Sequence, residues 1–200
     1  MASSANGRPR PEGLRERKRR ETAARIAEAG LRLFIAHGYD ATTLDDIAAE
    51  AGISRRTFFY YFKSKDDILL SMQSGFDVMI AAAIGDQPAG KSPIDTARDA
   101  LMAIAARYPA DDMIMIDKLM RSSPAVMARK QATYVEQEQQ LFAALHERWP
   151  DPERRPGLRS VAMIAIGAMR LALDIFHQEK GVRPIADVFR EVFDTIHAEV

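Results

Sequence analysis

Residues 43–65 follow the hydrophobic pattern of two short helices joined by a tight turn. The apolar residues of the first recur at the i, i+3, i+4, i+7 spacing of one helix face: Leu44, Ile47, Ala48 and Ala51. Thr43 and Asp46 have the spacing of a capping box, so this helix is expected to start there. Gly52 supplies the positive φ that ends it, and Ser54 can cap the helix that follows.

The second helix has too few inward positions for its apolar residues. Phe58 and Phe62, one turn apart, can face inward together. The remaining side chains form a basic and aromatic outer face: Arg55, Arg56, Thr57, Phe59, Tyr60 and Tyr61. Such a face is unfavourable in water unless a partner covers it, and a helix-turn-helix places its second helix in the DNA major groove. Two helices joined at a glycine also occur in unrelated helical proteins, which explains the caps but not the outer face.

The rest of the chain shows helical spacing and no strand alternation, so we expect an all-α protein. A helix over 15–37 should precede the helix-turn-helix. One continuous helix over 64–84 should follow it and join two parts of the chain. Further helices are expected over these ranges: 93–107, 110–122, 124–148, 157–179 and 184–198.

Composition limits the functional classes. The 200 residues carry no net charge, but residues 1–65 hold 13 Lys/Arg against 8 Asp/Glu, and the remainder holds 15 against 20. A positive front end and an acidic remainder suit a nucleic-acid-binding end. The absence of cysteine excludes disulfides and thiolate chemistry. No apolar run reaches the ~20 residues of a membrane span, and no signal peptide is present, so we expect no membrane partner and a cytoplasmic location.

Several short motifs occur together between residues 15 and 70: Leu33-Phe34, Gly38-Tyr39, Ala41-Thr42-Thr43, Asp46-Ile47-Ala48, Ala51-Gly52-Ile53-Ser54, Thr57-Phe58-Phe59-Tyr60-Tyr61-Phe62 and Ser64-Lys65. This region resembles the DNA-binding domain of TetR/AcrR-type transcriptional regulators. The resemblance implies an all-α homodimer with a three-helix DNA-binding domain and a carboxy-terminal domain that binds a small ligand and dimerises. The expected parts are a disordered basic tail over 1–13, the helix-turn-helix domain over 14–63 and the ligand-binding and dimerisation domain over 64–200.

The outer face of the second helix predicts two kinds of DNA contact. Phosphate contacts supply register and affinity, whereas base-edge contacts supply sequence choice. By resemblance, Thr43, Tyr61 and Lys65 are expected at phosphates; the family usually has His at position 61 and Tyr where Phe59 stands. The candidates for base edges lie near the helix N-terminus: Arg55, Arg56, Thr57 and Tyr60. The basic tail over 8–20 either reaches DNA or only aids solubility. A palindromic duplex is the expected partner.

The carboxy-terminal part is rich in methionine, which adapts to varied apolar partners. Residues 119–124 together with Arg129 and Glu136 resemble, more weakly, the subgroup that binds acyl-CoA-like ligands. A long or flat, mostly apolar effector with an acidic head is therefore expected. The candidate ligand-binding residues are Met72, Phe76, Met79, Met113, Met120, Arg121, Tyr134 and Met163. For each methionine, plain core packing is the alternative, and for Arg121 it is solvation.

Broad apolar stripes on 157–179 and 184–198 predict a four-helix dimer interface. Its candidate residues are Ala168, Ile175, Phe189 and Phe193. The four histidines show no metal-binding spacing and no nucleophile motif occurs, so we expect neither catalysis, metal nor cofactor. The chain is interpreted as a repressor released by an apolar small molecule. The alternative is a DNA-binding dimer without a small ligand, whose carboxy-terminal domain serves only dimerisation or protein partners.

Overall fold

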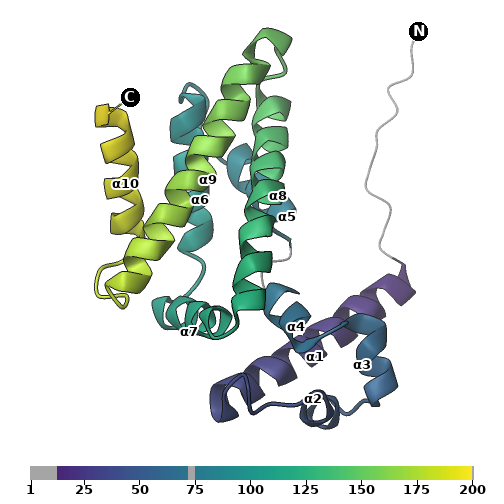
Figure 1. Ribbon diagram of the computed structural model, residues 1–200. Helices are drawn as coiled ribbons and strands as arrows, with labels where there is room; N and C mark the ends of the chain where they lie inside the picture. The colour runs from purple at the N-terminus through teal and green to yellow at the C-terminus, as the bar shows by residue number, and fades with distance from the viewer. Residues whose placement is uncertain (1–12, 72–74, 200) are drawn as a thin grey trace, which may run out of the picture. The chain divides into compact units, whose positions relative to one another are not determined.

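The computed structural model describes residues 13–71 and 75–199, and within these ranges every regular element is a helix (Figure 1). The chain forms two compact units, residues 1–72 and 73–200, and each is considered by itself. The expected all-α class, with an amino-terminal helix-turn-helix and a helical carboxy-terminal domain, is confirmed. The disordered tail expected over 1–13 lies outside the described residues except for Gly13, the N-cap of the first helix.

Four helices build the first unit: α1 Leu14–His37, α2 Leu44–Glu50, α3 Arg55–Tyr61 and α4 Lys65–Ser71. α1 packs against α2 and α4, and α2 packs against α3. The centre of this unit consists of side chains that are at most 1% exposed: Ile26, Phe34, Ile47, Phe58 and Ile68. Gly30 permits the close approach of α4 to α1, because a Cβ at this position would lie 2.8 Å from Ile68 Cδ1. α1 and α4 thus hold the two helices of the helix-turn-helix from behind.

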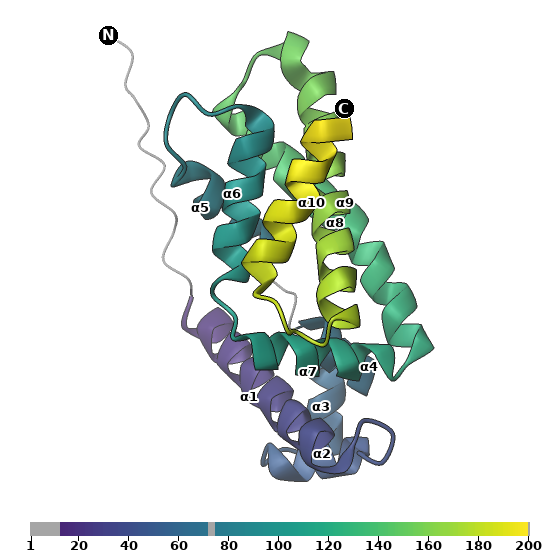
Figure 2. The same cartoon turned by 90° about the vertical axis from the view of Figure 1, so that its left-hand side faces the viewer.

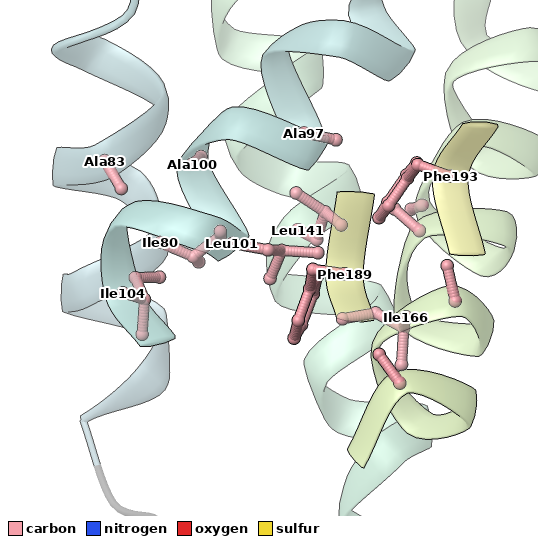
Figure 3. Close-up of a cluster of buried hydrophobic side chains, with 14 of the residues drawn as sticks. Ile80, Ala83, Ala97, Ala100, Leu101, Ile104, Leu141, Ile166, Phe189 and Phe193 are labelled. Carbon is pink, nitrogen blue, oxygen red and sulfur yellow. The ribbon is translucent and has the colours of Figure 1, made fainter. Parts of the chain in front are cut away.

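The second unit contains the remaining helices: α5 Phe76–Gly85, α6 Pro93–Ala105, α7 Ala110–Arg121, α8 Pro124–Arg148, the 3₁₀ turn η1 Pro152–Arg154, α9 Arg155–Gln178 and α10 Ile185–Glu199. α8 packs against α5 and α9, and α6, α9 and α10 pack against one another (Figure 2). Their shared core brings Leu101 of α6 and Ile166 of α9 together with Phe189 and Phe193 of α10 (Figure 3).

The helix boundaries agree with the sequence pattern in all but one case. The single helix expected over 64–84 is wrong, because Gly75 adopts φ +85° and separates α4 from α5. Ile68 and Leu69 of α4 are fully buried, and α4 packs on α1. The first unit therefore extends to residue 72 rather than ending at 63.

Two stretches, 65–85 and 152–178, are long and apolar enough by length and composition alone to cross a membrane. Core helices of globular proteins meet the same criterion, so it is a weak one. The first stretch is interrupted at Gly75, and the exposed face of α9 in the second carries Arg170 and Asp174. Charged side chains inside a bilayer are costly. We interpret both stretches as helices of the folded units.

Candidate functional site

The start of α2 and the turn between α2 and α3 contain the caps that the sequence predicts. Thr43 Oγ1 accepts a hydrogen bond from the Asp46 N–H (3.2 Å), and Asp46 Oδ2 accepts one from the Thr43 N–H (2.9 Å). The Thr43 hydroxyl, which donates to Asp46 Oδ2 (2.6 Å), and the Thr43 N–H hold the pKa of the Asp46 carboxyl below its ordinary value. Gly52 adopts φ +65°, and Ser54 Oγ accepts from the Thr57 N–H (3.0 Å) where α3 begins. The caps determine where α3 starts and hence which of its side chains face outward.

α3 divides its aromatic side chains between core and solvent. Phe58 is fully buried and Phe62 is 7% exposed, as the spacing predicts. Phe59 is 47% exposed and Tyr60 69%, although both are large apolar rings. The Tyr60 ring packs edge-on against Tyr61 at a centroid distance of 5.0 Å. The outer face of α3 is therefore an uncovered aromatic surface next to the exposed arginines at its start.

The two arginines of α3 differ in their surroundings. Arg55 Nη1 forms an ion pair with Asp45 Oδ2 of α2 (3.0 Å), and its guanidinium lies 5.8 Å from the centroid of the Phe59 ring. Arg56 is exposed, and within residues 13–71 and 75–199 it forms no ion pair of this kind. Of the two candidates for a base edge, Arg56 is the one presented by the outer face without a competing carboxylate.

Lys65 has a role that the sequence did not indicate. Its Nζ donates to the carbonyl oxygens of Tyr39 (2.7 Å) and Thr42 (3.3 Å) and lies 3.5 Å from that of Asp40. It also lies 4.3 Å from the centroid of the Tyr39 ring. The hydrogen bonds of the ammonium group therefore stabilise the turn over residues 39–42, which leads to Thr43. All three of its donors face carbonyl oxygens, which favours a positioning role, and the expected phosphate contact of Lys65 stays a prediction.

We expect Lys65→Met to weaken binding to all DNA sequences alike without changing the salt dependence of binding. Met preserves the apolar stem over Tyr39, while the hydrogen bonds from the charged group, worth about 1.5–3 kcal/mol, are lost. The measurement is log K against log salt concentration for wild type and variant. If the slope fell by about one unit, Lys65 would be a phosphate contact after all.

The inner face of α8 carries polar side chains where a core helix normally has apolar ones. Lys130, Tyr134 and Gln137 lie at i, i+4 and i+7, and each is at most 9% exposed. Burial raises the pKa of the Tyr134 hydroxyl, and the Arg170 guanidinium lies 4.6 Å from the Tyr134 ring centroid. Gln137 Oε1 is buried and has no hydrogen-bond partner. The further half of the same face is apolar: Leu141, Ala144 and Leu145.

The candidate ligand-binding residues have divergent environments. Phe76 and Met120 are buried, and Met79 and Met113 pack partly buried against the core. The expectation for Met163 is wrong, because this side chain is 51% exposed on the outer face of α9. Met72 lies outside the described residues. The sequence analysis did not identify Gln137. A signal was present, because the helical spacing of the apolar residues in α8 places this polar side chain on the buried face.

Arg121, expected to meet an acidic headgroup, is already paired. Its Nε lies 2.6 Å from Asp117 Oδ2, and its Nη2 lies 2.8 Å from Asp174 Oδ1. Asp117 Oδ1 also pairs with Lys130 Nζ at 3.1 Å. His177 Nδ1 lies 2.7 Å from Asp117 Oδ2. These residues tie α7 to α8 and α9, and we call them the Asp117 cluster. The carboxylates of Asp117 and Asp174 thus balance the positive charges of Arg121 and Lys130.

The expected dimer interface is also corrected. Phe189 and Phe193 point into the subunit's own core (Figure 3) and, like Ala168, are at most 3% exposed. Ile175 packs partly buried against the same core. The apolar side chains of α10, such as Phe189 and Phe193, are buried in the core of their own subunit, so they are not available for contact with a second subunit. One group of exposed apolar residues lies on the outer faces of α8 and α9. We call them the α8–α9 strip: Val135, Met163, Ile164, Gly167 and Leu171.

Comparisons with known proteins cover both units. The family model described as "Bacterial regulatory proteins, tetR family" matches residues 26–72, and that of the "MftR C-terminal domain" matches residues 91–200. The HTH-type transcriptional regulator TcmR of Streptomyces glaucescens is 26% identical over 208 residues, covering 98% of this chain and 92% of that protein.

Two solved structures share the fold. SmeT in its triclosan complex is 18% identical with a TM-score of 0.62, covering 90% of this chain and 91% of that one. Thermus thermophilus FadR, a repressor in complex with lauroyl-CoA, is 20% identical with a TM-score of 0.57, covering 86% and 91%. The helix-turn-helix geometry and the two family models agree. This chain belongs to the TetR family of bacterial transcriptional regulators, which bind DNA through the amino-terminal helix-turn-helix.

Proposed function

We propose that this regulator is a homodimeric repressor that a mostly apolar small molecule releases from a palindromic operator. The outer face of α3 carries the proposal, since Phe59, Tyr60 and Arg56 remain exposed on it. A two-fold dimer presents two such helices to half-sites about one helical turn apart. The second unit supplies an exposed apolar surface for the dimer and a buried polar face for the effector.

The α8–α9 strip is the proposed dimer interface. Leu171 is 52% exposed, Met163 51% and Val135 53%, although all three are apolar. Arg170 Nη2 of α9 donates to Gln131 Oε1 of α8 (2.8 Å), so the outer faces of the two helices adjoin. Two helices from each subunit then form a four-helix interface of the kind expected from the sequence, but with α8 in place of α10.

Base readout is assigned to Arg56, Thr57 and Tyr60, and phosphate contact to Thr43 and Tyr61. Arg56→Ala should lose discrimination at a single base-pair position by about 1–3 kcal/mol, because the guanidinium fork matches the edge of guanine. Arg55→Ala is the matched control, since Asp45 already engages that side chain. Both variants are compared by selection from random duplexes. Loss of discrimination from Arg55→Ala alone would reverse the assignment.

The effector must bind the DNA-incompetent conformation better than the competent one, or it cannot shift the equilibrium. A hundredfold loss of operator affinity requires about 2.7 kcal/mol of differential binding. SmeT and FadR were solved with triclosan and with lauroyl-CoA, respectively, and both ligands have apolar bodies. An acyl-CoA-like effector would need cations for its phosphates, yet Arg121 and Lys130 are paired with Asp117.

The proposal is tested with an operator selected from random duplexes and a reporter placed downstream of it. We expect a palindromic sequence, two subunits per duplex, and reporter expression that rises when the regulator is absent. A screen of apolar compounds should then find one that dissociates the complex. A single-site, monomeric complex, or a reporter that falls silent without the regulator, would contradict the proposal.

A further inference from the structure

The chemistry of the inner face of α8 narrows the class of effector. Its middle part, from Lys130 to Gln137, is polar and lies between the buried Val126 and an apolar part that begins at Leu141. Lys130 is accounted for, because its ammonium pairs with Asp117 at 3.1 Å. The Tyr134 ring is covered by the Arg170 guanidinium. Gln137 remains, with 9% exposure and an amide oxygen without a partner.

A buried polar atom without a hydrogen bond destabilises a folded protein, and native structures contain few of them. Each one therefore needs an explanation, of which a ligand group is one. Gln137 lies on a helix whose core positions would accept leucine or methionine, as Leu141 does one turn further on. An apolar residue at position 137 would avoid the cost of the unpaired oxygen. Retaining a carboxamide there makes sense if something else supplies the hydrogen bond.

The charges near this face argue against an anionic ligand. In the Asp117 cluster, Asp117 and Asp174 balance Arg121 and Lys130. Arg170, the further cation beside the Tyr134 ring, is exposed to solvent and donates to Gln131 Oε1. A carboxylate or phosphate entering here would meet the two acidic side chains or would have to break their ion pairs. The Lys130–Asp117 pair is buried, and separating a buried ion pair is strongly unfavourable. A neutral ligand has no such requirement.

We propose that the effector is uncharged and carries a hydroxyl or amide donor that hydrogen-bonds to Gln137 Oε1, with its apolar body in the core beside Tyr134. This inference rests on the proposed ligand-responsive function and specifies its site. It assigns Gln137 as the residue that selects ligands for a donor group. An acyl-CoA-like ligand is disfavoured by the same arrangement.

The first experiment needs no ligand. Gln137→Met replaces the unpaired carboxamide by an apolar side chain of similar length, so the ligand-free protein should gain about 2–4 °C in Tm. Leu141→Met is the matched control on the same face and should leave Tm unchanged or slightly lower. A lower Tm for Gln137→Met would mean that the carboxamide is satisfied within the folded protein, and the proposal would be overturned.

The second experiment uses triclosan, a chlorinated phenol, and its methyl ether, which has nearly the same shape but no donor. By isothermal titration, wild type should bind triclosan at least about tenfold more tightly than the ether, and Gln137→Met should bind the two alike. Lauroyl-CoA serves as the anionic probe and should bind more weakly than triclosan. Equal affinities in wild type, a difference that persists in Gln137→Met, tighter binding of lauroyl-CoA, or no saturable triclosan binding would each overturn the assignment.

The two proposals fail separately. A wild-type protein that binds its operator and releases it with some other compound, while Gln137→Met changes nothing, retains the proposed function and loses the role of Gln137. A protein that never forms a two-subunit operator complex loses the proposed function. The operator assay is therefore run on the same samples as the titrations.

Discussion

Leu171→Glu is expected to convert the regulator into monomers and to lower its operator affinity by about 10²–10⁴-fold, because two linked half-sites no longer act together. Leu171 is 52% exposed on α9, in the middle of the α8–α9 strip, so a charge there leaves the subunit's own core intact. In a two-fold interface the substitution occurs twice, and both carboxylates would lose water on association. Sedimentation at micromolar concentration and operator titration measure the two effects.

Val182→Glu provides the matched control. Val182 is 83% exposed, yet it lies between α9 and α10 and outside the strip. This variant should remain dimeric and bind the operator as wild type does. Phe189→Glu would be uninformative, since Phe189 is 1% exposed and a charge there would disrupt the core. If Leu171→Glu stayed dimeric with unchanged affinity, the interface would have to lie elsewhere.

The local elements could be predicted from the sequence because their signals are local. Caps such as Thr43 with Asp46, and Ser54 before α3, depend on hydrogen bonds within three residues. The inward spacing of Phe58 and Phe62 likewise sufficed to identify the outer face of α3. The motifs of the DNA-binding domain then led to the family, which the comparisons confirm.

The errors concern partners that are distant along the chain. An apolar stripe shows that a helix face is covered but not by what, so α10 appeared suited to a second subunit when α6 and α9 already cover it. The role of Lys65 could not be predicted for the same reason, since the carbonyl oxygens that it contacts lie 23–26 residues earlier in the sequence. Arg121 was expected at a headgroup because Asp174, 53 residues further along the chain, gave no local signal, although its other partner, Asp117, lies only four residues earlier.

Asp117→Asn is expected to destabilise the second unit by about 3 kcal/mol. The carboxylate serves Arg121, Lys130 and His177 together, and its side chain is 17% exposed, while that of Lys130 is 9% exposed. Removing one partner of a buried ion pair leaves the other charge uncompensated, which typically costs about 3–5 kcal/mol. The partial exposure of Arg121 places the expected value at the lower end. Urea unfolding at neutral pH gives the measurement.

The pH dependence of folding stability gives an independent check on the role of the Asp117 carboxylate. Burial by itself would raise the pKa of Asp117, but the hydrogen bonds and charges of Arg121 and Lys130 outweigh it, and the pKa lies below its ordinary value of 3.8. A lowered pKa in the folded state means that the carboxylate stabilises the protein above pH 3.8, and that this contribution disappears as the pH falls through the lower, folded-state value. Wild type should therefore lose more stability on acidification than Asp117→Asn does.

Two further variants test whether the Asp117 cluster contributes more to stability than an ordinary surface ion pair does. Asp187→Asn removes an ion pair with Arg190 in which both side chains are more than half exposed, and it should change stability by less than about 1 kcal/mol. Lys130→Met combined with Asp117→Asn should recover part of the loss, because the buried ammonium that lacks its carboxylate is then absent as well. If Asp117→Asn and Asp187→Asn were equally mild, the Asp117 cluster would be a solvated ion pair and could not hold α7 against α8 and α9.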